Sequence, residues 1–123
     1  MKKESYISED ERQKCQKVIE AFAELFEMEN SVVLDAGKYG FVFLLYYVEG
    51  QGFSEEKYFT DSLSLFEALW KEWLKTKLFL IGKDSEELDQ GGYDGVFQSL
   101  SKEEQERLTS RKADFAMTAA ISL

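Results

Sequence analysis

Histidine is absent from the 123 residues of this chain, whereas 24 side chains are Asp or Glu and 15 are Lys or Arg. Histidine is the side chain that most often serves as a general acid, a general base or a metal ligand near neutral pH. The chemistry left to the chain is that of carboxylates, amines and hydroxyls. A formal net charge of -9 therefore favours a protein that binds a positively charged partner over one that transforms a substrate.

Two pairs of carboxylates have the residue types that a glycosidase needs. Glu55 with Glu56, or Asp61 with Glu67, would supply one acid and one base or nucleophile. A small domain offers no evident deep cleft that would raise the pKa of one member of a pair, so we expect no enzymatic activity.

A further group of carboxylates lies in a glycine-containing stretch, and carboxylate oxygens are the ligands that calcium prefers. The spacing of the group matches no EF-hand, and its members are Asp84, Glu86, Glu87, Asp89 and Asp94. Clustered carboxylates alone are unspecific. The sequence therefore predicts neither a metal ion nor a cofactor.

Length and composition indicate one folded domain over residues 1–123. The mass of 14.2 kDa suits a single core, and 44% hydrophobic residues with 15% aromatic residues exceed what a disordered acidic chain contains. No apolar segment of a signal peptide follows the N-terminus, and the longest apolar run, residues 41–48, is far shorter than the roughly 18 residues of a membrane span. We expect a cytoplasmic protein that does not contact membranes.

The first helix is expected over residues 9–29. Ser8 and Glu11 have the spacing of a capping box, in which each side chain accepts from the other residue's backbone amide. Cys15, the single cysteine, lies on the apolar stripe of this helix with Val18 and Phe22, so we interpret it as a core residue.

A three-stranded antiparallel meander is expected next. Residues 32–36 and 41–48 are rich in β-branched and aromatic side chains and flank a glycine-containing turn, which predicts a hairpin. The second of these runs contains no polar side chain, so we place it at the centre of the sheet. Alternation over residues 53–60 predicts the third strand.

Two helices are expected after the sheet, giving an α+β fold in which both pack on the sheet. The first, residues 62–79, would bury Trp70 and Trp73, and four charged residues would face away: Glu67, Lys71, Glu72 and Lys75. Residues 84–100 are expected to be irregular because of three glycines. Ser101 and Glu104 form a second capping box, which starts a helix over residues 102–118.

The acidic residues are concentrated in two segments. Residues 20–61 and residues 84–106 each have a net charge of -7, while the segments around them are neutral to slightly basic. This charge either serves solubility alone or forms a face that attracts a basic partner. For the second case, we predict an interface with Tyr93 as its anchor and these acids: Glu49, Glu55, Glu56, Asp61, Asp84, Glu86, Glu87, Asp89 and Asp94.

The chain resembles, in general character, the small acidic immunity proteins of bacterial toxin systems, including contact-dependent inhibition. The resemblance spans residues 30–75 and depends on the aromatic run 41–48, the segment Tyr58-Phe59-Thr60-Asp61-Ser62 and the following Leu65-Phe66-Glu67-Ala68-Leu69-Trp70. It implies a non-enzymatic protein that binds a cognate toxin, often a basic nuclease, and blocks its active site or another essential surface. The resemblance includes no motif that would assign a role to any single residue.

Two other functions remain open. An acidic chain can mimic nucleic acid and occupy a DNA- or RNA-binding protein, although it would not bind nucleic acid itself. Alternatively, the aromatic side chains complete a homodimer of a structural or adaptor protein. Salt separates the first from a toxin inhibitor, since mimicry predicts steep loss of binding with rising salt and a hydrophobic interface does not.

Overall fold

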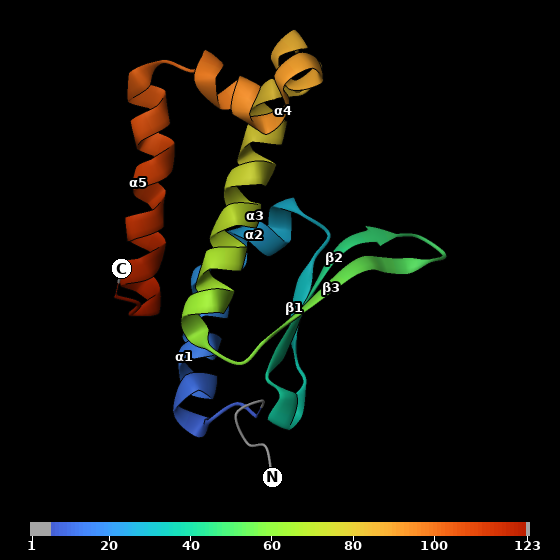
Figure 1. Cartoon of the computed structure of the whole chain (residues 1–123), viewed down its shortest axis with the longest axis vertical. Helices are drawn as coiled ribbons and strands as arrows, with labels where there is room; N and C mark the ends of the chain where they lie inside the picture. Colours follow the sequence, from blue (N-terminus) through green and yellow to red (C-terminus); the bar gives the residue numbers. More distant parts are fainter. Residues whose placement is uncertain (1–5, 123) are drawn as a thin grey trace.

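The computed structural model of the chain describes residues 6–122 (Figure 1). The elements are α1 (Glu9–Ala21), α2 (Ala23–Met28), β1 (Val32–Asp35), a single 3-10 turn η1 (Gly37–Tyr39), β2 (Phe41–Val48), β3 (Gly52–Phe59), α3 (Ser62–Gly82), α4 (Glu86–Ser99) and α5 (Lys102–Ala119). The sheet is antiparallel with the order β1-β2-β3. The predicted α+β class, the meander and the central place of β2 are confirmed.

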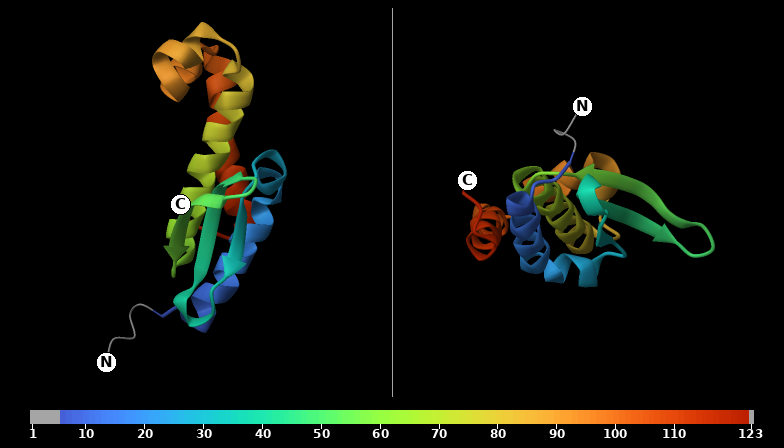
Figure 2. Two further views of the ribbon diagram at one scale, coloured as in Figure 1. Left: turned by 90° about the vertical axis from the view of Figure 1, so that its right-hand side faces the viewer. Right: turned by 90° about the horizontal axis from the view of Figure 1, so that it is seen from below.

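The helices lie on one side of the sheet (Figure 2). Helices α1 and α3 form the middle layer, and α5 packs against α1 on the side away from the strands. The prediction that both helices after the sheet pack on it is therefore wrong for α5. Over the residues that the structure describes, no helix covers the opposite face of the sheet (Figure 2).

The start of α1 differs in one hydrogen bond from the predicted capping box. Ser8 Oγ accepts from the Glu11 amide at 3.1 Å, as predicted. The Glu11 carboxylate, however, accepts from the Ser62 amide at 2.6 Å and from Ser62 Oγ at 3.0 Å. Glu11 thus binds the first turn of α3 and ties the two helices together, since free amides at a helix start need acceptors. The second capping box, Ser101 with Glu104, forms in full.

Aromatic rings from three helices form the centre of the core. The predicted helix over residues 9–29 is interrupted at Phe22, whose ring stacks on Phe115 of α5 with centroids 4.3 Å apart. Trp73 of α3 meets Phe115 edge-on at 5.2 Å and stacks on Trp70 at 5.4 Å. Both tryptophans are buried, as predicted.

The segment expected to be irregular forms α4, so three helices follow the sheet. Its two halves meet at Gly92, whose backbone at φ 64° and ψ -154° is accessible almost only to glycine. A Cβ atom at Gly95 would lie 2.6 Å from the Glu87 carbonyl oxygen, so the glycine lets the two halves approach. The glycines break this helix without abolishing it. None of the described helices is both long and apolar enough to cross a membrane.

Replacing Phe115 by alanine tests whether α5 completes the core. We expect Phe115→Ala to lower the free energy of unfolding in urea by about 3 to 5 kcal/mol, the usual cost of removing a buried ring. Met117→Ala, on the exposed side of the same helix, should change it by less than about 0.5 kcal/mol. Equal effects of the two substitutions would contradict the packing of α5.

The thiol of Cys15 is buried in this core, and burial followed by the nearby Glu11 and Asp61 carboxylates raises its pKa to about 11. A thiol with a high pKa and no access reacts slowly with disulfide reagents. We expect the native protein to be inert to dithionitrobenzoate at pH 8 and to react fully in guanidinium chloride. A Met117→Cys variant, with its new thiol on the surface, is the reactive control. Reaction of Cys15 at the rate of that control would contradict its burial.

Candidate functional site

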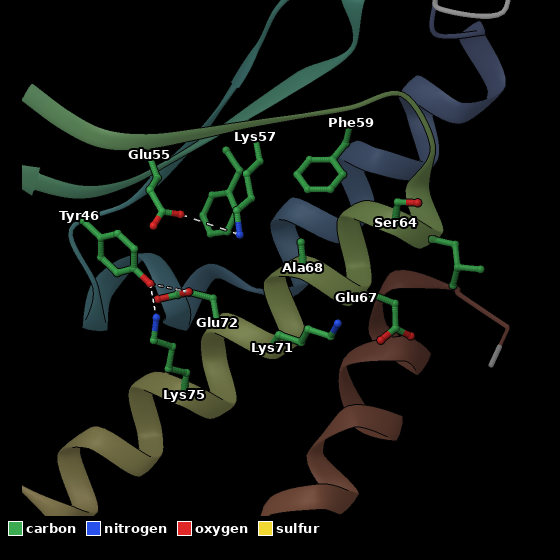
Figure 3. A pocket seen from close by; sticks show the side chains of 12 residues that line it. Tyr46, Glu55, Lys57, Phe59, Ser64, Glu67, Ala68, Lys71, Glu72 and Lys75 are labelled. Carbon is green, nitrogen blue, oxygen red and sulfur yellow. Dashed lines mark hydrogen bonds and ion pairs between the residues drawn. The ribbon is translucent and has the colours of Figure 1, made fainter. Parts of the chain in front are cut away.

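A groove of about 740 Å³ separates β3 from α3 (Figure 3). Its apolar surface comes from Phe43 and Phe59 of the sheet and from Leu63 and Ala68 of α3. Its charged residues come from both walls and alternate in sign: Glu55, Lys57, Glu67, Lys71, Glu72 and Lys75. A groove of this size that combines apolar and charged side chains suits a ligand or a segment of a protein that carries both.

The strand alternation decides which residues of β3 face the groove. Lys57 pairs with Phe43 of the core, whereas Glu56 pairs with Leu44 on the opposite face. Side chains of successive residues in a strand point to opposite faces. Glu55, Lys57 and Phe59 therefore point toward α3, as Figure 3 shows, and Glu56 points to the face without helices.

Tyr46 interrupts this alternation in β2. Its backbone is left-handed, with φ 57°, which costs a residue with a side chain roughly 1 to 2 kcal/mol. Leu45 is part of the core, and the side chain of the next residue, Tyr46, also turns to the helical side and reaches α3. A strained residue held by surrounding contacts is often part of a functional site.

The Tyr46 hydroxyl is bound between two side chains of α3 (Figure 3). It donates to Glu72 Oε1 at 3.3 Å and accepts from the Lys75 ammonium, which lies 4.8 Å from the centre of the Tyr46 ring. Glu72 is only 7% exposed. The prediction that Glu72 faces away from the core with its charged neighbours is wrong, because Tyr46 folds over this part of α3.

The pKa values in this cluster indicate binding chemistry. Burial raises the pKa of the Glu72 carboxyl, and the nearby Glu29 carboxylate adds to this while Lys75 opposes it. Burial raises the pKa of the Tyr46 phenol, and the hydrogen bond to Tyr46 raises that of the Lys75 ammonium. At neutral pH Tyr46 is thus neutral and Lys75 is charged, so neither is a nucleophile.

A smaller cavity of about 180 Å³ adjoins the groove and shares Tyr46, Glu72 and Lys75 with it. Its remaining walls are Glu29 before β1, Thr76 and Phe79 of α3, and Tyr93 of α4. Two acceptor atoms at this place, Glu72 Oε2 and Thr76 Oγ1, are buried without a hydrogen-bond partner among the described residues. Buried polar atoms are normally paired, so these two call for an explanation.

The face of the sheet without helices carries apolar side chains. Tyr58 of β3 is 58% exposed and Leu34 of β1 is 47% exposed, and both pair with Val42 of β2. Tyr39 and Tyr58 line a shallow hollow with Ala36 and Thr60. Strand β3 thus separates the charged groove from an apolar surface.

Four of the predicted interface residues lie near this strand or the groove. Glu55 lines the groove and is within 4.0 Å of Lys57. Glu56 lies on the face without helices, and Glu49 is in the turn between β2 and β3. Tyr93 lies on the smaller cavity, where the Lys75 ammonium is 5.6 Å from its ring centre.

The other predicted residues lie at the two ends of α3. Asp61 precedes the helix and is its N-cap, since its carboxylate accepts from the Ser64 amide at 2.8 Å. The remaining acids follow the opposite end, about 30 Å away for a helix of this length: Asp84, Glu86, Glu87, Asp89 and Asp94. Asp61 and this group therefore do not form one compact patch. Within residues 6–122, no group of three or more potential ligands could hold a metal ion.

Three residues of the site were not singled out by their sequence pattern as functional: Tyr46, Glu72 and Thr76. The uninterrupted apolar run of β2 conceals the change of face at Tyr46. Glu72 and Thr76 are four residues apart on α3, and a carboxylate and a hydroxyl at this spacing are common on exposed helix faces. Only the Tyr46 conformation marks this face as buried.

Comparisons of the chain with family models, with curated proteins and with solved structures found no match.

The raised pKa of Glu72 predicts a pH-dependent loss of stability. From the ordinary value of 4.5 upward, the folded protein binds more protons at Glu72 than the unfolded chain does, so its free energy of unfolding falls as the pH rises. Glu72→Gln removes this effect. We expect the free energy of unfolding of the variant in urea, relative to that of the wild type, to increase measurably from pH 4 to pH 7.

Glu104 gives a control of opposite sign. Its pKa is lowered, first by the hydrogen bond from the Ser101 amide, so its contribution is present above the ordinary value of 4.5 and is lost as the pH falls. Glu104→Gln should therefore lose stability relative to wild type over the same rise in pH. If both variants follow parallel curves, Glu72 does not have a raised pKa.

Proposed function

We propose that this chain is a protein-binding domain that recognises a basic partner along β3. The observation that carries the proposal is the position of β3 between the charged groove and the apolar face of the sheet. A partner seated there would bury apolar area at its centre and meet charged residues around it. This is the usual arrangement of a specific protein interface.

The free edge of β3 supports the same surface. In the described sheet β3 pairs with β2 alone, so one row of its backbone donors and acceptors faces outward. Edge strands of this kind are places where another chain can add main-chain hydrogen bonds. The charged pair Glu55 and Lys57 limits unspecific pairing there, and a partner with matching charges overcomes that limit.

The charge of this region favours a basic partner. Residues 20–61, which include β1, β2 and β3, have a net charge of -7. Negative potential attracts a basic protein and increases its association rate, while it repels nucleic acid and anionic lipid. The acids of α4 lie farther from β3, so in this proposal they steer the partner and make few contacts with it.

We further propose that the partner is a bacterial toxin and that the chain is its immunity protein. This step is supported by the resemblance of residues 30–75 in character and by the net charge of -7 over residues 20–61. It has a direct test in the gene immediately upstream. We expect that gene to encode a secreted toxin whose C-terminal domain co-purifies with this chain in a fixed ratio. Failure of the two proteins to associate would refute the immunity role.

Variants on β3 test the interface with that toxin domain. We expect Tyr58→Ala and Glu56→Lys each to raise the Kd by about tenfold or more, as for an aromatic anchor and a close charge in an interface. Glu103→Lys on α5 makes the same charge change far from β3 and should leave the Kd within about twofold. Calorimetry measures all three, and equal effects of Glu56→Lys and Glu103→Lys would refute the β3 surface.

The acids of α4 have a different expected effect. Reversing Glu86, Glu87 and Asp89 to lysine should slow association and leave dissociation nearly unchanged, because steering acts before contact. An unchanged association rate would show that the acids of α4 do not steer the partner.

Salt and mass measurements decide between this proposal and the two other functions. A toxin complex with an apolar centre should keep most of its affinity between low and moderate salt. A steep loss with salt would instead favour a mimic of nucleic acid. A dimeric mass of the isolated chain, lost on Tyr58→Ala, would favour the homodimer.

A further inference from the structure

We propose that the 180 Å³ cavity between Tyr46, α3 and Tyr93 is a binding site for a guanidinium group, supplied by an arginine side chain of the partner. The polar atoms, charge and aromatic walls of the cavity favour a guanidinium group whatever its source. Only the source of the guanidinium rests on the proposed function.

Two buried polar atoms on residues that line the cavity lack hydrogen-bond partners, and the N–H donors of a cationic ligand would satisfy them. Glu72 and Thr76 are each 7% exposed, and Glu72 Oε2 and Thr76 Oγ1 have no hydrogen-bond partner in the part of the chain that the structure describes. The two residues are one helical turn apart, so their side chains lie one above the other. Leaving such atoms unpaired costs the protein stability, which a bound ligand with N–H donors would restore.

The local charge favours a cation. Two carboxylates, Glu29 and Glu72, line the cavity, and Lys75 is the single cationic side chain among its lining residues. The Tyr46 and Tyr93 phenols also line the cavity, and the adjoining groove adds two acids and two bases: Glu55, Lys57, Glu67 and Lys71. The lining thus has two carboxyl groups against one ammonium, an excess of acid that a monovalent cation would offset.

The aromatic walls favour a planar cation over a compact one. Phe79 and Tyr93 line the cavity together with Tyr46, and Phe79 is 43% exposed at its mouth. The Lys75 ammonium already lies on the Tyr46 and Tyr93 rings. A guanidinium is weakly hydrated, stacks on rings and offers five N–H donors in a fixed plane, so it can stack on Phe79 while it donates to Glu72 and Thr76.

Nuclear magnetic resonance titration of the full chain with N-acetyl-arginine methylamide tests the site. We expect saturable shifts of amides around Tyr46, Glu72, Thr76 and Tyr93, with millimolar affinity for so small a ligand. The matching citrulline compound has the same shape without charge and the lysine compound has charge without the planar fork. Each should bind at least about fivefold more weakly.

Glu72→Gln removes the carboxylate charge and replaces one acceptor oxygen by an NH2 donor, and Thr76→Val removes the hydroxyl, both at nearly constant volume. We expect roughly tenfold weaker binding of the arginine compound for Glu72→Gln, the loss typical of one charged hydrogen bond, and a smaller loss for Thr76→Val. Glu103→Gln makes the same change on α5, at a residue that is paired with Arg107 at 3.2 Å and lines neither the groove nor the cavity, and should have no effect. Amide spectra of the free variants establish that each is folded.

Several results would overturn the site. These are the absence of saturable shifts at Tyr46 and Glu72, equal binding of the arginine and lysine compounds, or unchanged binding by Glu72→Gln. Free arginine or agmatine binding at least about tenfold tighter than the capped compound would keep the site and assign it to a free metabolite.

The protein interface along β3 and the guanidinium site can each be refuted without refuting the other. If the toxin domain binds wild type and Glu72→Gln equally, the protein interface stands and the guanidinium inference fails. If the arginine compound binds at Glu72 but no basic protein binds at β3, the site stands and the proposed function fails.

Discussion

The stacked rings of Phe22 and Phe115 hold α5 against α1, on the side of the molecule away from the strands. Because α5 is occupied there, α1 and α3 are the helices that cover the sheet, and they cover one face only. A three-stranded sheet packed in this way keeps an exposed face and two free edges. The apolar face, the free edge of β3 and the groove beside α3 all follow from this arrangement.

The groove acquires its chemistry from Tyr46. The left-handed backbone at this residue brings a second consecutive side chain to the helical side, and the ring then covers Glu72 and Lys75. The covered carboxylate loses contact with water, which raises its pKa. One backbone conformation in β2 thus accounts for the buried charge, the two unpartnered acceptors beside it and the smaller cavity that they line.

The sequence was sufficient for the three strands, for the helices α1, α3 and α5 and for much of the core, because all of these depend on local signals. Periodicity placed Cys15, Trp70 and Trp73 inside, and Ser101 with Glu104 marked the start of α5. Contacts between residues that are far apart in the sequence could not be predicted from these local signals. Glu11 binds Ser62 across 51 residues of chain, and Glu72 is buried because a distant strand folds over it. The prediction for α4 was wrong because glycines such as Gly92 and Gly95 occur both in loops and at the break between two helical halves.

Of the predicted interface, Glu55 lines the groove and Tyr93 lines the adjoining cavity. The α4 acids and Asp61 lie at opposite ends of α3.

Hydrogen exchange of the chain with and without the upstream-encoded toxin domain shows which strands and helices the partner covers. Backbone amides exchange more slowly where a partner covers them or their hydrogen-bonded neighbours. If the partner binds along β3, new protection is expected along β3 and in the part of α3 that lines the groove, residues 53–76, with α5 unchanged. Protection confined to α4 and α5, with β3 exchanging as in the free protein, would contradict it.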